Sequence, residues 1–299
     1  MDKLKAMTVF VAVAEEHGFA AAARRLSMSP PMVTRTVAEL EQQLGVILLL
    51  RTTRQVRLTE AGQQFLQDAR RIIAEVVSAE ESISGIHGNP SGELVITAPA
   101  MFGCLYVTPV ITLYLETYPQ VSVSAVFVDR VTHLMEEGID VGIRIGALPD
   151  SSMHSIQMGT VTLKTYAAPT YLARFGEPTS PQALSEHRLI SSTAGGHGPL
   201  WRYYEGGREF TLKTNPVLRS TTNDSVIAAA VAGHGITRVL SYQAEPEVCS
   251  GRLQPILEKF EGAPIPVSIV HPKGRNVPTK VRAFIDMATR ELRSQPVLQ

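Results

Sequence analysis

Residues 20–58 decide the fold of the N-terminal part of this chain and read AAAARRLSMSPPMVTRTVAELEQQLGVILLLRTTRQVRL. The stretch opens with a short alanine-rich helix that carries Arg24. Ser29 then stands at the N-cap position of a second helix, and Pro30 and Pro31 occupy its first positions. Proline costs little there, because the N–H groups of a first helical turn have no intrahelical partner. The pattern predicts two short helices joined by a tight turn.

The second helix has one apolar and one polar face. From Met32 to Leu44 its apolar residues recur every three or four positions, which is the spacing of a single buried face. The opposite face begins with Thr34 and Arg35. A helix-turn-helix that exposes the first turn of its second helix is the arrangement that enters a DNA major groove. We therefore expect Pro31, Thr34 and Arg35 to face DNA, with Arg35 either hydrogen-bonded to guanine or held on a phosphate.

A hairpin-like segment follows Gly45, and its tip combines cations with hydroxyl groups. Beside a helix-turn-helix such a hairpin is a wing. We expect Arg51, Thr53 and Arg54 to meet phosphates or a narrow minor groove, with solvated surface charge as the alternative. The predicted DNA-contacting residues are Arg24, Ser29, Pro30, Pro31, Thr34, Arg35, Arg51, Thr53 and Arg54.

The composition is that of a folded protein. Of the 299 residues, 44% are hydrophobic and 19% are charged, so the chain can bury cores and exceeds the usual size of one domain. Its formal net charge is zero, which by itself argues against a nucleic-acid partner. Most cations of the first 58 residues nevertheless lie in the helix-turn-helix and the wing. Because phosphates would be met there, the local charge favours double-stranded DNA as a partner.

The cysteine content and the N-terminus bear on the compartment. Cys104 and Cys249 stand far apart and outside any metal-ligand or redox spacing, and so few cysteines favour a reducing compartment. The N-terminus lacks the layout of a signal peptide, and we find no apolar run of the length needed to cross a bilayer. We expect a cytoplasmic protein without a membrane partner.

A long helix without proline is predicted from Glu60 to His87. Its apolar residues keep a heptad spacing: Phe65, Ala69, Ile72, Val76, Ala79, Ile83 and Ile86. A helix that buries only such a stripe needs a partner helix. We expect the seam to pair two copies of the chain, since a DNA reader gains a second half-site by dimerising; packing on its own domain is the alternative.

Residues 87–92, His-Gly-Asn-Pro-Ser-Gly, have the composition of a hinge. The sequence thus divides into a DNA-binding domain at 1–58, a linker and dimerisation helix at 59–89, and a third domain at 90–299.

Beyond the hinge, strands and helices alternate. The first series consists of strands at 93–99, 121–128 and 140–146, with helices at 102–118 and 131–137. Such a series implies a parallel sheet with right-handed crossovers. A second, similar series follows, and the tail of the chain can rejoin the first. The expected fold class is therefore α/β, with two Rossmann-like subdomains after an all-α N-terminus: lobe I at about 90–162 and 265–299, and lobe II at about 163–264.

Ligands of open α/β sheets bind at the carboxyl ends of the strands, near helix N-termini. The residues at those places are Pro99, Ala100, Met101, Phe102, Ile145, Gly146, Thr193, Trp201, Thr222 and Asn223. Trp201 is either a lid over an apolar ligand or a core residue. Asp129 is expected to cap the helix that follows it, and Arg144 to have an internal acidic partner rather than an effector carboxylate.

Four ordered stretches resemble LysR-type transcriptional regulators: residues 29–62, 129–152, 224–236 and 277–288. Residues 29–62 are similar to that family's recognition helix, wing and linker-helix start. The resemblance implies a homotetrameric DNA-binding regulator. It also implies that the third domain is periplasmic-binding-protein-like and senses a small-molecule effector between its lobes. RNA polymerase is a further candidate partner.

The chain departs from that family at two places. Leu49 stands where many members have phenylalanine in the wing, and Met101 stands where many have a serine at the start of the first helix of the effector domain. The second departure argues against an effector carboxylate held by a hydroxyl group.

No set of residues points to catalysis. Cys104 has no histidine with an orienting acid nearby in the sequence, and His133 and Glu137 lack the second histidine of a zinc protease. Gly-Gly-His-Gly at 195–198 lacks the strand-to-helix context of a phosphate-binding loop. We expect neither an enzyme nor a cofactor. The alternative function is a cytoplasmic small-molecule binding protein whose N-terminal helices serve assembly only.

Overall fold

The computed structural model describes residues 2–51, 56–83, 89–148, 153–194, 200–273 and 277–299. It divides into two compact units. The first comprises Met1–Asn89 with Met135–Gly138 and Gly274–Thr279, and the second comprises the remaining residues.

The first unit is built on three helices: α1 (Lys3–Glu15), α2 (Phe19–Arg25) and α3 (Pro30–Leu44). Most of the apolar face predicted for α3 is buried, with Val33 and Val37 fully enclosed, but Leu44 at the end of the helix is 43% exposed. Ser29 has the extended backbone of an N-cap, although its side chain makes no capping hydrogen bond. Gly45 ends α3 in the left-handed conformation at φ +71°, which glycine adopts without steric cost.

The wing consists of β1 (Leu49–Arg51) and β2 (Val56–Leu58), paired antiparallel. A single carboxylate fixes it to α3: Oε1 of Glu41 accepts the backbone N–H groups of Leu48 at 2.8 Å and of Leu49 at 3.0 Å. The predicted tip residues Thr53 and Arg54 lie outside the described residues.

The linker helix α4 (Glu60–Ile83) begins next to Thr59, whose hydroxyl accepts the N–H of Gly62 at 2.9 Å. Phe65 packs edge-on against Phe10 of α1 at 5.4 Å between ring centroids, and Ala69 has no exposed surface. Phe65 thus packs within its own chain, which is the alternative to an intermolecular contact, and the burial of Ala69 agrees with that alternative.

The outer part of the seam is half-buried at Ile72 and Val76. The side chains of Ala79 and Ile83, and the whole of Ile86, lie outside what the structure describes.

The second unit contains two five-stranded sheets, one in each lobe. The lobe I sheet has the order β4-β3-β5-β14-β6. Its strands are β3 (Gly92–Ala98), β4 (Val121–Phe127), β5 (Val141–Ile145), β6 (Met153–Val161) and β14 (Ile265–Pro272). β3 pairs parallel with β4 and β5, whereas β14 runs antiparallel to β5 and β6. The tail therefore rejoins lobe I as predicted, but it makes the sheet mixed.

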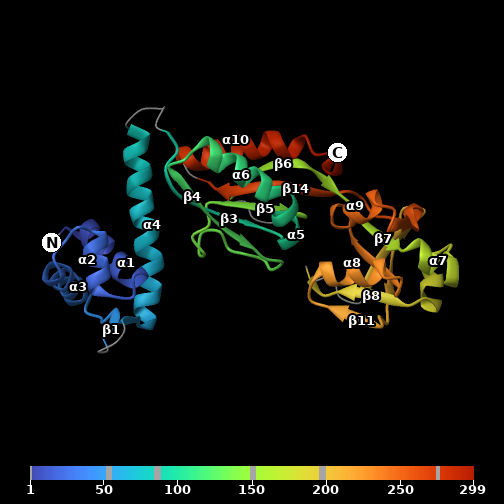
Figure 1. Ribbon diagram of the computed structural model, residues 1–299, viewed down its shortest axis with the longest axis horizontal. Helices are drawn as coiled ribbons and strands as arrows, with labels where there is room; N and C mark the ends of the chain where they lie inside the picture. Colours follow the sequence, from blue (N-terminus) through green and yellow to red (C-terminus); the bar gives the residue numbers. More distant parts are fainter. Residues whose placement is uncertain (1, 52–55, 84–88, 149–152, 195–199, 274–276) are drawn as a thin grey trace. The chain divides into compact units, whose positions relative to one another are not determined.

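One continuous helical run lies over this sheet beside the C-terminal helix (Figure 1). It comprises α5 (Ala100–Phe102), a π-helical turn (Gly103–Val107) and α6 (Thr108–Thr117), and its neighbour is α10 (Thr279–Arg293). The ring of Tyr114 meets Phe284 edge-on at 5.4 Å, and its hydroxyl donates to the backbone oxygen of Lys280 at 2.7 Å.

By length and composition alone the run Ala100–Thr117 is apolar enough to cross a membrane, so the expectation that no such run exists was wrong. One side of this run is buried against its own domain, at Phe102, Val110 and Tyr114.

The predicted helix at 131–137 is absent: residues 131–133 have no regular structure, and the chain turns at 134–138. Arg144 binds this segment, because it donates to the backbone oxygen of Thr132 and, at 2.6 Å, to that residue's hydroxyl.

The lobe II sheet has the order β11-β8-β12-β7-β13. Its strands are β7 (Leu163–Ala167), β8 (Leu189–Ser192), β11 (Leu218–Ser220), β12 (Ile236–Leu240) and β13 (Gln254–Ile256). Its helices are α7 (Pro169–Phe175), α8 (Asn223–Val231) and α9 (Ser241–Cys249), with single 3-10 turns at Pro181–Glu186 and Glu258–Phe260. A last 3-10 turn, Pro296–Leu298, follows α10.

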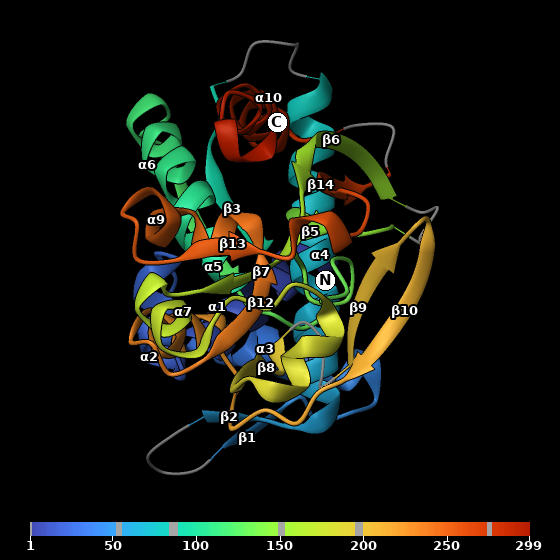
Figure 2. The same cartoon turned by 90° about the vertical axis from the view of Figure 1, so that its right-hand side faces the viewer.

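A separate antiparallel hairpin, β9 (Leu200–Glu205) and β10 (Arg208–Lys213), stands beside this sheet (Figure 2). Residues 208–212 have the pattern of an extended strand and match β10, whereas β6, β9, α7 and α9 were not predicted. Gly206 and Gly207, both at positive φ, make the hairpin turn, and that Gly-Gly pair was a readable signal.

Removing the Glu41 carboxylate tests how the wing is fixed. Glu41→Ala leaves the N–H groups of two buried residues without this acceptor, and we expect a loss of about 2 kcal/mol or more in the free energy of unfolding. Thermal unfolding of the full chain measures it. Gln43→Ala, an exposed position on the same helix, is the control. Equal melting temperatures for both variants would contradict this role.

Candidate functional site

The first turn of α3 forms an exposed surface. Pro30, Pro31 and Met32 are exposed, and 82% of the Arg35 side chain is accessible. Thr34 is half-buried, and its hydroxyl donates to the backbone oxygen of Pro30 at 3.0 Å. These five residues therefore lie together at one end of the helix, and Pro31, Thr34 and Arg35 are the three that the spacing predicted there.

Met32 was not singled out from the sequence. Its side chain belongs to the same surface, and 52% of the residue is exposed. A large apolar side chain at this place offers contact with the methyl group of a thymine. An apolar residue outside the buried 3.6-residue pattern was the signal that could have found it.

The guanidinium of Arg35 has one partner within α3. Its Nε donates to Oε1 of Glu39 at 2.7 Å, one turn further along the helix. The hydrogen bond to this carboxylate raises the pKa of Arg35, so the side chain stays cationic.

The two arginines of α2 have different surroundings. Arg25 donates to Glu15 at 2.7 Å and lies 3.4 Å from Glu16, so it fastens α2 to α1. Burial tends to raise the pKa of Glu15, but hydrogen bonds from Arg70 and Arg25 outweigh it and the pKa falls. Arg24 is exposed. Arg25 thus has a structural role, whereas Arg24 is the arginine of α2 that remains a candidate for DNA contact.

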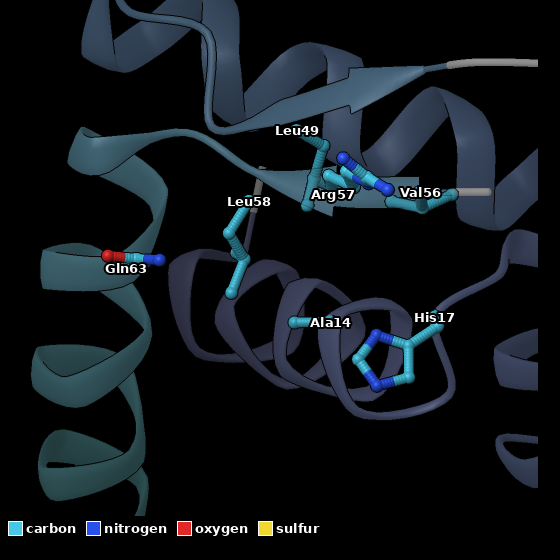
Figure 3. Close-up of a pocket in the computed structure, with 7 residues that line it drawn as sticks. All are labelled: Ala14, His17, Leu49, Val56, Arg57, Leu58 and Gln63. Carbon is cyan, nitrogen blue, oxygen red and sulfur yellow. The ribbon is translucent and has the colours of Figure 1, made fainter.

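A small hollow lies between the wing, the end of α1 and the start of α4 (Figure 3). Its volume is about 290 Å³, and its lining includes Leu49, Val56, His17 and Arg57.

In lobe I the predicted effector residues begin at the N-terminus of α5. Pro99 is its N-cap, and the N–H of Ala100 donates to Oδ1 of Asp129 at 3.0 Å. The expectation that Asp129 caps the following helix is wrong, because that helix does not form. Asp129 instead caps the preceding helix, α5. Its carboxylate accepts the N–H of Ala100, a group at a helix N-terminus to which an effector anion would otherwise bind.

Two of the predicted effector residues join the lobes. Met101 packs against the hydrophobic core of lobe II, and Phe102 is fully buried. The ring of Phe102 lies 5.2 Å from those of both Tyr106 and Tyr242, the latter on α9 of lobe II. In this structure the ring of Phe102 thus takes part in packing between the lobes. Ile145 and Gly146, at the end of β5, are half-buried.

In lobe II the two predicted threonines hydrogen-bond to nearby serines. Both the N–H and the hydroxyl of Thr193 donate to the backbone oxygen of Ser220, at 2.8 and 3.2 Å. The hydroxyl of Thr222 shares a hydrogen bond of 2.8 Å with Ser225, and Asn223 begins α8. These residues lie at the carboxyl ends of β8 and β11, where the topology predicted them.

Trp201 is only 4% exposed and belongs to the lobe II core. The interpretation as a lid over a ligand is wrong and the alternative, a core residue, is right. Its position on β9 explains this, since Trp201 and Tyr203 share the face of the hairpin that packs inward.

A second hollow, of about 380 Å³, lies between α5 and the two helices α8 and α9. Its lining includes the apolar side chains of Met101, Leu105 and Ile227 and the polar side chains of Asp224 and Gln243. Met101 is the one predicted effector residue in its lining. The contribution of α9 could not be foreseen because that helix was missed.

A buried arginine in lobe II was also missed. Arg238 is 8% exposed, and its guanidinium carbon lies 4.1 Å from the ring centroid of Tyr203. It donates to Thr165 at 2.9 Å and to the backbone oxygen of Arg202 at 2.8 Å, which fastens the hairpin to the sheet. Burial lowers its pKa. Among the described residues no group of three or more histidine, cysteine or acidic side chains could hold a metal.

Comparison with known proteins decides the family. Residues 87–293 match the model of the LysR substrate-binding domain, and residues 4–63 match that of the bacterial regulatory helix-turn-helix protein of the lysR family. The chain belongs to the LysR family. It is thus a DNA-binding transcriptional regulator with an effector-responsive domain, and the alternative of a binding protein without DNA function is wrong.

Named relatives agree with this family assignment. The chain is 31% identical over 288 residues to the transcriptional regulator CrgA of Neisseria meningitidis, covering 96% of each protein. It is 33% identical over 291 residues to the activator AaeR of Escherichia coli, covering 97% of this chain and 94% of AaeR.

Solved structures agree on the fold. The CrgA structure superposes with a TM-score of 0.63 at 30% identity, over 96% of this chain and 98% of CrgA. Full-length AphB of Vibrio cholerae gives 0.62 at 24% identity, over 95% and 98%.

The place of Trp201 can be tested directly, because it is the only tryptophan of the chain. We expect the fluorescence emission of a buried indole, quenched only weakly by acrylamide. Trp201→Ala should lower the free energy of unfolding by about 3–5 kcal/mol, and Trp201→Phe by less. Strong quenching together with unchanged stability would restore the lid interpretation.

Proposed function

We propose that this LysR-family regulator reads operator DNA through the first turn of α3 and steadies itself on phosphates through the wing. The observation that supports this most is the exposed end of α3, where Arg35 projects beside Pro31, Met32 and Thr34. Ser29, Pro30 and Arg24 flank this surface. Arg51, Thr53 and Arg54 complete the contact from the wing.

The domain boundaries proposed are 1–58, 59–89 and 90–299. We propose that two copies pair through the outer part of α4, beyond the residues that α1 covers. Ile72 and Val76 support this, because both are apolar and only half-buried. Part of their apolar surface is therefore available to a second copy. Two such dimers would give a homotetramer.

We propose that the effector binds between the lobes, at Pro99, Ala100, Met101, Ile145, Gly146, Thr193, Thr222 and Asn223. Phe102 and Trp201 leave the set because of their burial. The carboxylate of Asp129 already accepts the N–H of Ala100. We therefore propose an effector that binds without using this N–H group.

We further propose a cytoplasmic regulator without catalytic activity, which acts on RNA polymerase at the promoter. Its relatives are named as regulators and none of those cited as an enzyme. Both an activator of Escherichia coli and a repressor of Pseudomonas aeruginosa are among them, so the sign of regulation does not follow from the family.

Two substitutions test the proposed DNA contact. Arg35→Ala should remove sequence preference, because it deletes the candidate base contact, worth about 1–3 kcal/mol of discrimination. Arg54→Ala should weaken binding to all duplexes alike and reduce the salt dependence of log K by about one unit of slope. Competition binding at several salt concentrations measures both. The same loss of preference from both variants would contradict this division.

Effector binding is tested by thermal shift. A ligand at one hundred times its Kd stabilises the folded state by about 2.7 kcal/mol, so a screen of aromatic and aliphatic acids, with neutral analogues beside each acid, should find it. Thr193→Val should reduce the shift. Thr211→Val, at an exposed position of the hairpin, should leave it unchanged. An equal effect of both variants would place the effector elsewhere.

A further inference from the structure

The contact between Arg35 and Glu39 restricts how the arginine can be used. Only Nε of the guanidinium donates to the carboxylate, at 2.7 Å. A guanidinium carries five N–H groups in one plane, so four of them, on the two terminal nitrogens, remain outside this hydrogen bond. Those terminal nitrogens form the fork that fits the two acceptors of guanine, O6 and N7.

The same contact orders a side chain that would otherwise be free. Arg35 is 82% accessible, and a long exposed arginine loses conformational entropy when it is fixed on DNA. A hydrogen bond to Glu39, itself 40% accessible and one turn away on the same helix, fixes the plane of the guanidinium before DNA arrives. Part of the ordering is then complete in the free protein.

Glu39 also changes the electrostatics of the surface. Its negative charge lies against the cation that would approach the DNA, and it offers nothing to a phosphate, which has only acceptor oxygens. Paired in this way, Arg35 attracts phosphates less strongly at any sequence. The carboxylate therefore weakens non-specific binding while it favours the one contact that depends on the base.

Thr34 gives the same surface a second base-directed property. Its hydroxyl proton is already donated to the backbone oxygen of Pro30 at 3.0 Å, so the hydroxyl can only accept from DNA. A phosphate cannot donate, whereas the amino groups of adenine and cytosine can. Both polar residues of the first turn are thus better suited to bases than to the backbone.

We propose that Glu39 is a positioning residue that holds Arg35 as a reader of guanine, so that the operator carries a G·C pair opposite Arg35. This rests on the proposed function, namely that the first turn of α3 binds DNA. It goes beyond it by assigning a role to a residue that does not itself read the base and by naming the base pair.

The test uses the full-length protein and a selection from random duplexes, which yields the operator and the position that loses its preference in Arg35→Ala. Binding is then measured to duplexes with each of the four base pairs at that position, at several salt concentrations. The variants are Glu39→Gln, which removes the charge, and Glu39→Asp, which keeps the charge on a side chain too short for the same contact.

Both variants should lower discrimination for G·C at that position by about tenfold. Glu39→Gln should in addition strengthen non-specific binding and steepen the salt dependence by about one unit of slope, whereas Glu39→Asp should not. Glu60→Gln removes the same charge from the same unit at an exposed position away from Arg35, and discrimination should persist. In the Arg35→Ala background, Glu39→Gln should cause no further loss of discrimination.

The outcomes separate the two proposals. If Arg35→Ala loses preference while both Glu39 variants keep it, or if the preferred pair is not G·C, the positioning role is overturned and the proposed DNA contact stands. If Arg35→Ala keeps its preference at every position, the proposed reader fails and this inference fails with it. Circular dichroism and thermal unfolding of each variant exclude a loss of fold as the cause.

Discussion

The surface that we propose to bind DNA depends on the burial of one face of α3. Val33 and Val37 have no exposed surface, and Leu40 has 3%. Because a helix repeats every 3.6 residues, enclosing these positions leaves Arg35 and Glu39 on the outer face, one turn apart. The pairing of that arginine with its acid is thus a geometric consequence of where the core of the first unit lies.

The wing is tied to the same helix by a charge. Glu41 lies two residues beyond Glu39, yet its carboxylate turns inward and accepts two backbone N–H groups of the segment that leads into β1. Two neighbouring glutamates on one helix therefore have different tasks, since one faces the core side and the other the solvent. The linker helix α4 follows the wing directly, and its residue Phe65 packs against Phe10 of α1. What remains for a partner copy is the outer part of α4.

In the second unit the start of the first helix fastens the lobes to each other. Met101 enters the core of lobe II, and Phe102 is enclosed by Tyr106 and Tyr242. Residues chosen as effector contacts because they follow a strand are thus engaged in packing between lobes. An effector that bound beside them would act on the same contact that sets how the lobes meet.

The sequence by itself determined the α3 reading surface, the wing, the long linker helix and the alternation of strands and helices, because each depends on local periodicity, caps and glycine positions. It also carried enough of the LysR pattern to identify the family. Only the tertiary structure decided which side chains are buried: that Trp201 and Phe102 are core, that Phe65 and Ala69 pack within the chain, and that Asp129 caps α5 rather than a helix after it. The physical reason is that burial, capping and side-chain hydrogen bonds join residues far apart in the chain, as the bond between Arg144 and Thr132 does, and local spacing carries no record of such partners.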